Sequence, residues 1–183
     1  MGRAIVFTRW AVLLMALWGV LPMGSANEVD RDARVQAALT IRILKFITWP
    51  PHAIVNKAGT VRLCTVGQSP VTAALATQSG GEPANFGVTV LSITHDAPVD
   101  VLKTCDAMYS SLTNEREWSG LLARLSGLPV LTIGTHNNFV NSGGIIQLRR
   151  FENRYVFDIN LSEAKGLGLK ISSPLLSLSA QVY

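Results

Sequence analysis

Hydrophobic side chains recur every three or four positions over residues 27–48, the spacing of one face of an amphipathic helix. Asn27 or Asp30 can cap the start of this helix, and Trp49-Pro50-Pro51 ends it. The sequence therefore predicts a long N-terminal helix with one apolar face, made of Val35, Ala38, Leu39, Ile43, Phe46 and Ile47.

After this helix, short β-prone runs alternate with helical runs. The predicted strands span 61–66, 87–93, 105–111 and 129–134, and the predicted helices span 71–77 and 114–125. The last of these strands is apolar throughout, which is typical of a strand buried on both faces of a parallel sheet.

The pattern changes in the last third of the chain. Residues 144–150 and 154–160 are adjoining extended runs with Glu152-Asn153 between them, which predicts a hairpin. Helical signals follow at 161–167 and 174–182. The predicted fold class is α/β: a sandwich with a mostly parallel central sheet, an antiparallel edge hairpin and helices on both faces.

The first 26 residues have the order of a secretory signal peptide. Arg3 and Arg9 precede an apolar run at 10–21, and small residues follow at 24–26. A helix of 12 residues rises only about 18 Å, too short for a bilayer core of roughly 30 Å. We therefore expect residues 1–26 to be cleaved, and residues 27–183 to form a single periplasmic domain without direct membrane insertion.

The charge balance bears on the class of partner. The full chain has 16 basic and 12 acidic residues, a net charge of +4, and removing Arg3 and Arg9 leaves 14 against 12, or +2. Nucleic-acid binding needs a clustered basic surface, so this nearly balanced chain is not expected to bind nucleic acid.

Cys64 and Cys105 are the two cysteines of the chain. An even number of cysteines in an oxidising compartment favours a disulfide, although two buried free thiols are the alternative. The Cys-x-x-Cys spacing of thiol redox centres is absent.

Motifs of enzyme active sites were sought in the sequence. His52, His95 and His136 are its three histidines, and the run 67–71 begins like the Gly-x-Ser-x-Gly nucleophile elbow but fails at Val71. Ser69 within that run is better explained as the cap of the following helix. A hydrolase that uses one of the histidines is therefore the least favoured function.

The sequence also lacks the common metal-binding and cofactor-binding motifs. The pair His95-Asp96 with Asp100 lies in a proline-containing loop without ligand-like spacing, so a solvated loop is favoured over a metal site. The P-loop, His-Glu-x-x-His and Gly-x-Gly-x-x-Gly patterns are absent. We expect no catalytic residues, no metal and no cofactor.

Small and hydroxyl-bearing residues follow three of the predicted strands. The carboxyl ends of parallel strands form the rim at which open α/β sheets bind ligands, so a polar or anionic ligand is conceivable there. The favoured alternative is that these are ordinary turn residues in tight connections. The candidate rim residues are Gln68, Ser69, Ser110, Ser111, Thr135 and His136.

Two surfaces are suited to protein partners. The helix 29–48 is our first choice, with Arg42, Lys45 and Trp49 as its candidate contacts. The alternative for Trp49 is a plug over the helix end. The hairpin turn is flanked by arginines, whose simpler role is to protect an exposed strand from pairing: Arg149, Arg150 and Arg154.

Several sequence blocks occur in an order that is specific as a set. They are Lys45-Phe46-Ile47-Thr48-Trp49-Pro50, Leu63-Cys64-Thr65-Val66-Gly67, Pro129-Val130-Leu131-Thr132-Ile133-Gly134, Phe139, Gly143-Gly144-Ile145-Ile146, Phe157-Asp158-Ile159-Asn160-Leu161, Gly168-Leu169-Lys170-Ile171-Ser172-Ser173 and Leu175-Leu176. This set resembles the YfiR-like family of periplasmic proteins and covers nearly all of the chain after residue 26.

The resemblance implies an exported α/β domain without enzymatic activity. The best-known members of the family repress a membrane-anchored diguanylate cyclase by binding its periplasmic sensor region, which lowers cyclic di-GMP and restrains biofilm formation. This chain departs from the family pattern at Ile41, Arg42, Thr48 and Asp106. These departures bear on which partner is bound.

A second function of a different class stays open. It is a periplasmic small-molecule sensor that serves another receptor or a histidine kinase. A homodimer is a further possibility for either function.

Overall fold

The computed structural model describes residues 25–51, 53, 59–78 and 87–183. Most of the predicted signal peptide and His52 therefore lie outside the described residues. In the described part of the chain, no helix is both long and apolar enough to cross a membrane.

Seven strands form one sheet in the order β3-β2-β4-β5-β6-β7-β9. Their bounds are β2 (Thr60–Val66), β3 (Gly87–Ile93), β4 (Ala107–Ser110), β5 (Leu131–Gly134), β6 (Ile146–Phe151), β7 (Arg154–Ile159) and β9 (Gln181–Val182). Strands β3, β2, β4, β5 and β6 run parallel to one another, and β7 runs antiparallel to β6. The prediction of a mostly parallel sheet with an antiparallel hairpin is confirmed.

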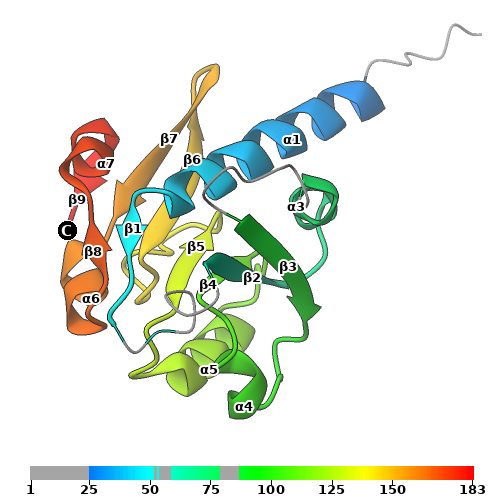
Figure 1. Cartoon of the computed structure of the whole chain (residues 1–183). Helices are drawn as coiled ribbons and strands as arrows, with labels where there is room; N and C mark the ends of the chain where they lie inside the picture. Colours follow the sequence, from blue (N-terminus) through cyan, green and yellow to red (C-terminus); the bar gives the residue numbers. More distant parts are fainter. Residues whose placement is uncertain (1–24, 52, 54–58, 79–86) are drawn as a thin grey trace, which may run out of the picture.

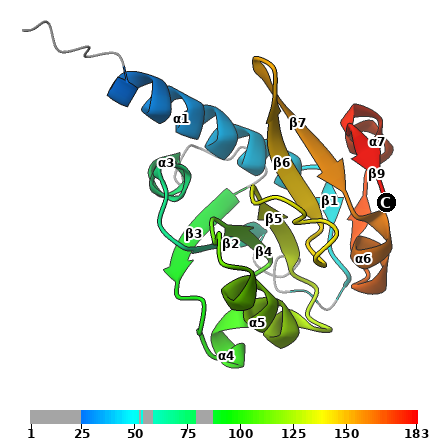
Figure 2. The ribbon, with the colours of Figure 1, turned by 180° about the vertical axis from the view of Figure 1, so that it is seen from behind.

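Helices cover both faces of this sheet (Figures 1 and 2). One face carries α1 (Ser25–Leu44) and α3 (Pro70–Gln78), and the other carries α4 (Val99–Leu102) and α5 (Glu115–Leu125). The last part of the chain adds α6 (Leu161–Gly166) and α7 (Ser173–Leu178). A small second sheet pairs β1 (Ile47–Thr48) with β8 (Lys170–Ile171).

The alternation of side chains along the strands divides the interior into two cores. In β2, Val61 and Leu63 face the core beneath α1 and α3, whereas Cys64 and Val66 face the core beneath α5. All four side chains are fully buried. Although helices cover both faces of β2, Arg62 and Thr65 interrupt its apolar residues.

Two predicted helices end earlier than expected. The first stops at Leu44, since β1 then pairs with β8. The last was predicted over 174–182, but α7 ends at Leu178 and β9 adds to the open edge of β7. The hairpin is therefore next to the edge of the sheet, and β9 is the edge strand.

Phe139 is a wedge in the connection from β5 to β6. Its ring is fully buried and stacks on Trp118 of α5, with 4.5 Å between the ring centroids. A Cβ atom added at Gly134 or Gly144 would come within 2.3 or 2.2 Å of this ring. Both glycines are therefore required for close packing rather than for an unusual backbone conformation.

We predict that Gly144→Ala lowers the free energy of unfolding by about 1–3 kcal/mol, because the added methyl group displaces the Phe139 ring. Urea unfolding followed by Trp fluorescence measures this. Gly120→Ala is the matched control: it lies in α5 with nothing within 4 Å of the added Cβ, so it should be neutral or stabilising. Equal stability of the two variants would contradict the packing argument.

Cys64 and Cys105 form a disulfide, with a Cα–Cα distance of 5.7 Å. Both residues are buried, and the bridge joins β2 to the residues that lead into β4. It packs in the core beneath α5 together with Leu102 and Trp118. The alternative of two free thiols was wrong.

We predict that the double variant Cys64→Ala/Cys105→Ala is less stable than the oxidised protein by about 3–4 kcal/mol, because the bridge no longer restricts the unfolded chain. Urea unfolding with and without reductant measures the difference. The double variant should not respond to the reductant. Identical unfolding of the oxidised and reduced wild-type protein would argue against a stabilising bridge.

Candidate functional site

The N-terminal turns of α1 project beyond the sheet (Figure 1). The helix is held to the hairpin by an ion pair of Asp32 with Arg150, and by Gln36, whose Nε2 donates to the Tyr155 hydroxyl at 2.8 Å. These contacts leave a row of exposed side chains on the opposite side of the helix. We call this row the α1 surface: Glu28, Arg31, Val35, Ala38, Arg42 and Lys45. The prediction that Val35 and Ala38 lie on the apolar face was wrong, because Ala33 and Ala37 are the residues of this part of α1 that pack in the core.

The three predicted partner contacts are placed differently. Arg42 and Lys45 are exposed at the C-terminal end of the α1 surface. Trp49 is 5% exposed, and its indole Nε1 donates to the Asp106 carbonyl oxygen at 2.8 Å. Trp49 therefore lies inside the domain, as the plug alternative describes, whereas Arg42 and Lys45 are accessible at the surface.

Asp106 connects Trp49 to the central strands. Its carboxylate Oδ2 accepts a hydrogen bond from the Arg62 amide at 2.8 Å. Its carbonyl oxygen accepts a second hydrogen bond, from the Leu131 amide at 3.0 Å. Because Asp106 is 3% exposed, these bonds compensate for the loss of hydration of a buried polar residue.

The candidate rim lies at the ends of β2, β4 and β5, which are neighbours in the sheet. Its serines are bound into local turns. Ser69 caps α3, since its Oγ accepts from the Thr72 amide at 3.2 Å. Ser111 Oγ donates to the Val66 carbonyl at 3.1 Å, and Ser110 Oγ accepts from the Leu112 amide at 3.4 Å. This geometry fits the turn interpretation that the sequence favoured.

The other rim residues point to different surroundings. Gln68 is exposed. His136 Nδ1 lies 2.5 Å from the Asn137 carbonyl oxygen, so this nitrogen is assigned the proton, and the ring packs edge-on against Trp118 and Phe139. Within the described residues, Trp118 Nε1 and His136 Nε2 are buried without a hydrogen-bond partner.

Thr135 is exposed and belongs to a polar cluster with Tyr109, Tyr155 and Gln36. Burial raises the pKa of the Tyr109 hydroxyl to about 12, while a hydrogen bond with Thr135 acts in the opposite direction and Tyr155 adds to the rise. The Tyr109 hydroxyl also donates to Gln36 Oε1 at 3.5 Å. The cluster therefore joins α1 to the ends of the central strands.

The predicted metal-site candidates His95, Asp96 and Asp100 are all exposed, and the described residues contain no group of three side chains able to hold a metal ion. A hydrogen bond from Thr94 is the main reason that the pKa of Asp96 lies below its usual value. His95 and Asp96 lie in a loop, as predicted, whereas Asp100 lies in the first turn of α4.

The three hairpin arginines have separate contacts. Arg149 forms a bidentate ion pair with Asp158, at 2.7 and 3.2 Å, and this hydrogen-bonded contact raises the pKa of the guanidinium. Arg150 binds Asp32 of α1, and Arg154 lies 6.0 Å from the Phe151 ring centroid. The first two arginines therefore contribute to the structure of the hairpin and the position of α1.

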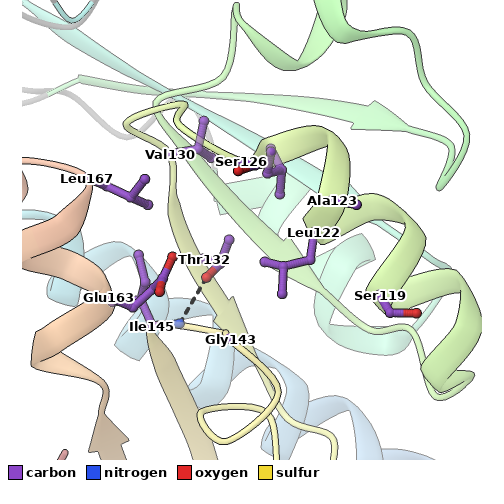
Figure 3. A pocket seen from close by; sticks show the side chains of 11 residues that line it. Ser119, Leu122, Ala123, Ser126, Val130, Thr132, Gly143, Ile145, Glu163 and Leu167 are labelled. Carbon is purple, nitrogen blue, oxygen red and sulfur yellow. Dashed lines mark hydrogen bonds between the residues drawn. The ribbon is translucent and has the colours of Figure 1, made fainter.

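Sequence reasoning missed a pocket of about 340 Å³ between α5, β5 and α6 (Figure 3). Its walls come from segments as far apart as Ser119 and Leu167, and Glu163 points into it. A local pattern did exist, because Asn160 and Glu163 have the spacing of a helix-capping pair. That pattern predicts a helix start and gives no indication of a pocket.

Comparison with known protein families identifies the chain. A family model described as YfiR/HmsC-like matches residues 33–180. The chain belongs to the YfiR/HmsC-like family. This confirms the family that the sequence blocks suggested, and no curated protein sequence matches the chain.

Solved structures share the fold of this YfiR/HmsC-like protein. One is the ABC domain from Streptococcus pneumonia in complex with L-Trp, with a TM-score of 0.55 and 11% identity over 80% of the chain. Another is a conserved domain protein from Vibrio cholerae o1 biovar eltor, with a TM-score of 0.56 and 12% identity over 82% of the chain. The match covers 60% of the length of each of these proteins, and it shows a shared fold alone.

We predict that the YfiR/HmsC-like domain loses stability as the pH rises from 10 to 12. In this window the unfolded Tyr109 ionises while the folded, buried one keeps its proton. The loss from this residue is at most about 3 kcal/mol. Unfolding at several alkaline pH values measures the slope, which Tyr109→Phe should reduce and the exposed control Tyr183→Phe should preserve. The same slope in both variants would exclude Tyr109 as its source.

Proposed function

We propose that this protein is a periplasmic, non-enzymatic regulator that binds the sensor region of an inner-membrane diguanylate cyclase and holds it inactive. Such repression lowers cyclic di-GMP and restrains biofilm formation. The observation that carries this proposal is the family match over 33–180, which spans both cores and nearly all described elements. The family is regulatory rather than catalytic, which supports a non-enzymatic role.

Export is part of the proposal. The signal-peptide pattern of residues 1–26 supports secretion, and the buried Cys64–Cys105 disulfide is typical of an oxidising compartment. A periplasmic domain is in the same compartment as the sensor region of a membrane-anchored cyclase. The two can then meet without either one crossing the membrane.

The α1 surface is the proposed contact with the cyclase. It is exposed along the helix, and its C-terminal end carries Arg42 and Lys45, which suit an acidic patch on the partner. Repression requires that the protein binds the inactive sensor conformation more tightly than the active one. Each tenfold difference in these affinities shifts the equilibrium by about 1.4 kcal/mol toward the inactive state.

A periplasmic small-molecule sensor that serves another receptor is the second candidate. The observation in its favour is the fold shared with the ABC domain that was solved in complex with L-Trp. A rise in melting temperature with a polar ligand, together with capture of a different receptor, would favour this candidate over the first.

We predict that the exported protein, as bait, recovers a membrane-anchored diguanylate cyclase from detergent-solubilised inner membranes, identified by mass spectrometry. The double charge reversal Arg42→Glu/Lys45→Glu should reduce recovery at least tenfold, because it places acidic groups against the acidic patch that we propose. Arg116→Glu, an exposed charge reversal on α5, is the control and should leave recovery unchanged.

The recovered proteins distinguish an error in the proposed contact surface from an error in the proposed target. Recovery of the cyclase by both variants would keep the function and move the contact away from α1. Recovery of a different receptor by the wild-type protein would replace the cyclase as the target.

A further inference from the structure

The pocket in Figure 3 lies beside α5, on the face of the sheet opposite α1. Its volume of about 340 Å³ is in the range of small-molecule sites. The walls are mainly apolar and come from four segments, with Leu122, Leu125, Val130, Ile145 and Leu167 as the main side chains.

Gly143 forms one side of the pocket and allows Leu122 to pack there. Its φ of +91° is in the region that favours glycine, and an added Cβ would come within 2.5 Å of Leu122 Cδ2. The wall is therefore held by close contact between the loop before β6 and α5. A pocket whose wall is fixed in this way needs little rearrangement to bind a ligand.

Glu163 is the charged group of this pocket, and its position has a specific cause. In a capping box, the glutamate side chain would bind the backbone amide of the capping residue. Asn160 does cap α6, with its Oδ1 accepting from the Glu163 amide at 2.9 Å. However, the Asn160 amide donates to the Ile145 carbonyl at 2.7 Å, so it is not available to the Glu163 carboxylate.

The carboxylate instead points into the pocket, between Leu167 and Thr132 (Figure 3). Among the described residues it has no ion-pair or hydrogen-bond partner. Thr132 Oγ1 accepts from the Ile145 amide at 2.9 Å and forms no hydrogen bond with Glu163. A half-buried carboxylate beside apolar side chains attracts a cation that restores its lost interactions with water.

The chemistry of the walls restricts which cation fits. A hard metal ion needs several oxygen ligands, usually with more than one carboxylate, whereas this pocket offers a single carboxylate and the neutral hydroxyls of Ser119, Ser126 and Thr132. A protonated amine needs one anionic acceptor, and its hydrocarbon part gains from burial against the apolar walls. The two features of the pocket therefore match the two parts of an apolar amine.

We propose that this pocket binds a small protonated amine with a compact apolar body, with Glu163 as the counter-ion. This site is separate from the α1 surface and does not depend on the identity of the protein partner. Leu122, Leu125 and Val130 enclose the apolar body of the ligand, and the ammonium group donates to the Glu163 carboxylate.

Benzylamine, titrated into the isotopically labelled protein and followed by NMR of the backbone amides, tests the proposal. We expect saturable shifts at Leu122, Gly143, Ile145 and Leu167. Benzyl alcohol, which has the same shape without the charge, should bind about tenfold more weakly, and benzoate should bind more weakly still.

Substitution of Glu163 tests whether its carboxylate is the counter-ion of the bound amine. Glu163→Gln should weaken benzylamine binding about tenfold and leave benzyl alcohol binding unchanged, because only the ion pair is removed. Glu115→Gln, an exposed change on α5 outside the pocket, is the matched control and should bind as the wild type does.

Three results would overturn the proposal: no saturable shift with benzylamine, shifts confined to other parts of the chain, or equal benzylamine affinity in wild type and Glu163→Gln. None of them affects the proposed regulation of a cyclase. Conversely, if Glu163→Gln binds benzylamine weakly and still captures the membrane partner, the ligand site stands independently of the partner contact.

Discussion

The C-terminal base of α1 is anchored at one backbone atom, the carbonyl oxygen of Asp106. It accepts hydrogen bonds from Trp49, at the end of the segment that follows α1, and from the amide of Leu131 at the start of β5. Asp106 is also bound to Arg62 of β2 through its carboxylate, and it follows Cys105 of the disulfide. A buried carbonyl with two donors fixes three segments at one point, since losing either donor leaves a polar group without compensation. Trp49 anchors the base of α1 at this point, and the contacts of Asp32 and Gln36 with the hairpin hold the rest of the helix.

The alternation of β5 separates the two functional regions of the molecule. Ile133 faces the core that supports α1, whereas Thr132 faces the pocket beside α5. Both regions are therefore built on the same strand but on opposite faces of the sheet. Phe139 strengthens this arrangement, because its ring fills the space between Gly134 and Gly144 and fixes the loop from which one pocket wall is made. The proposed protein contact and the proposed ligand site therefore do not overlap.

Elements with a clear pattern in their own residues were predicted closely. Strand 87–93 has the bounds of β3, and α5 begins after Asn114, whose side chain accepts from the Arg116 amide. The errors fall where distant segments decide the structure. Strands β1, β8 and β9 have two residues each, and they exist because Ile47 pairs with Ile171 and β9 pairs with β7. No local pattern contains that information, so the helix predicted over 174–182 extended too far. The burial of Trp49 has the same origin, since its partner Asp106 is 57 positions away.

At Glu163 the local capping pattern correctly marks the start of a helix, but the direction in which the Glu163 side chain points is decided by a distant segment. Asn160 caps α6 as the spacing predicts. The reciprocal half of the motif is missing because the Ile145 carbonyl, from the strand-forming segment before β6, already occupies the Asn160 amide. This hydrogen bond between Asn160 and Ile145 continues the pairing of β6 with β7, and it leaves the Glu163 carboxylate facing an apolar pocket. A sequence motif thus specifies which bonds a segment can form, while the packing of the whole chain decides which of its groups stay available to a ligand.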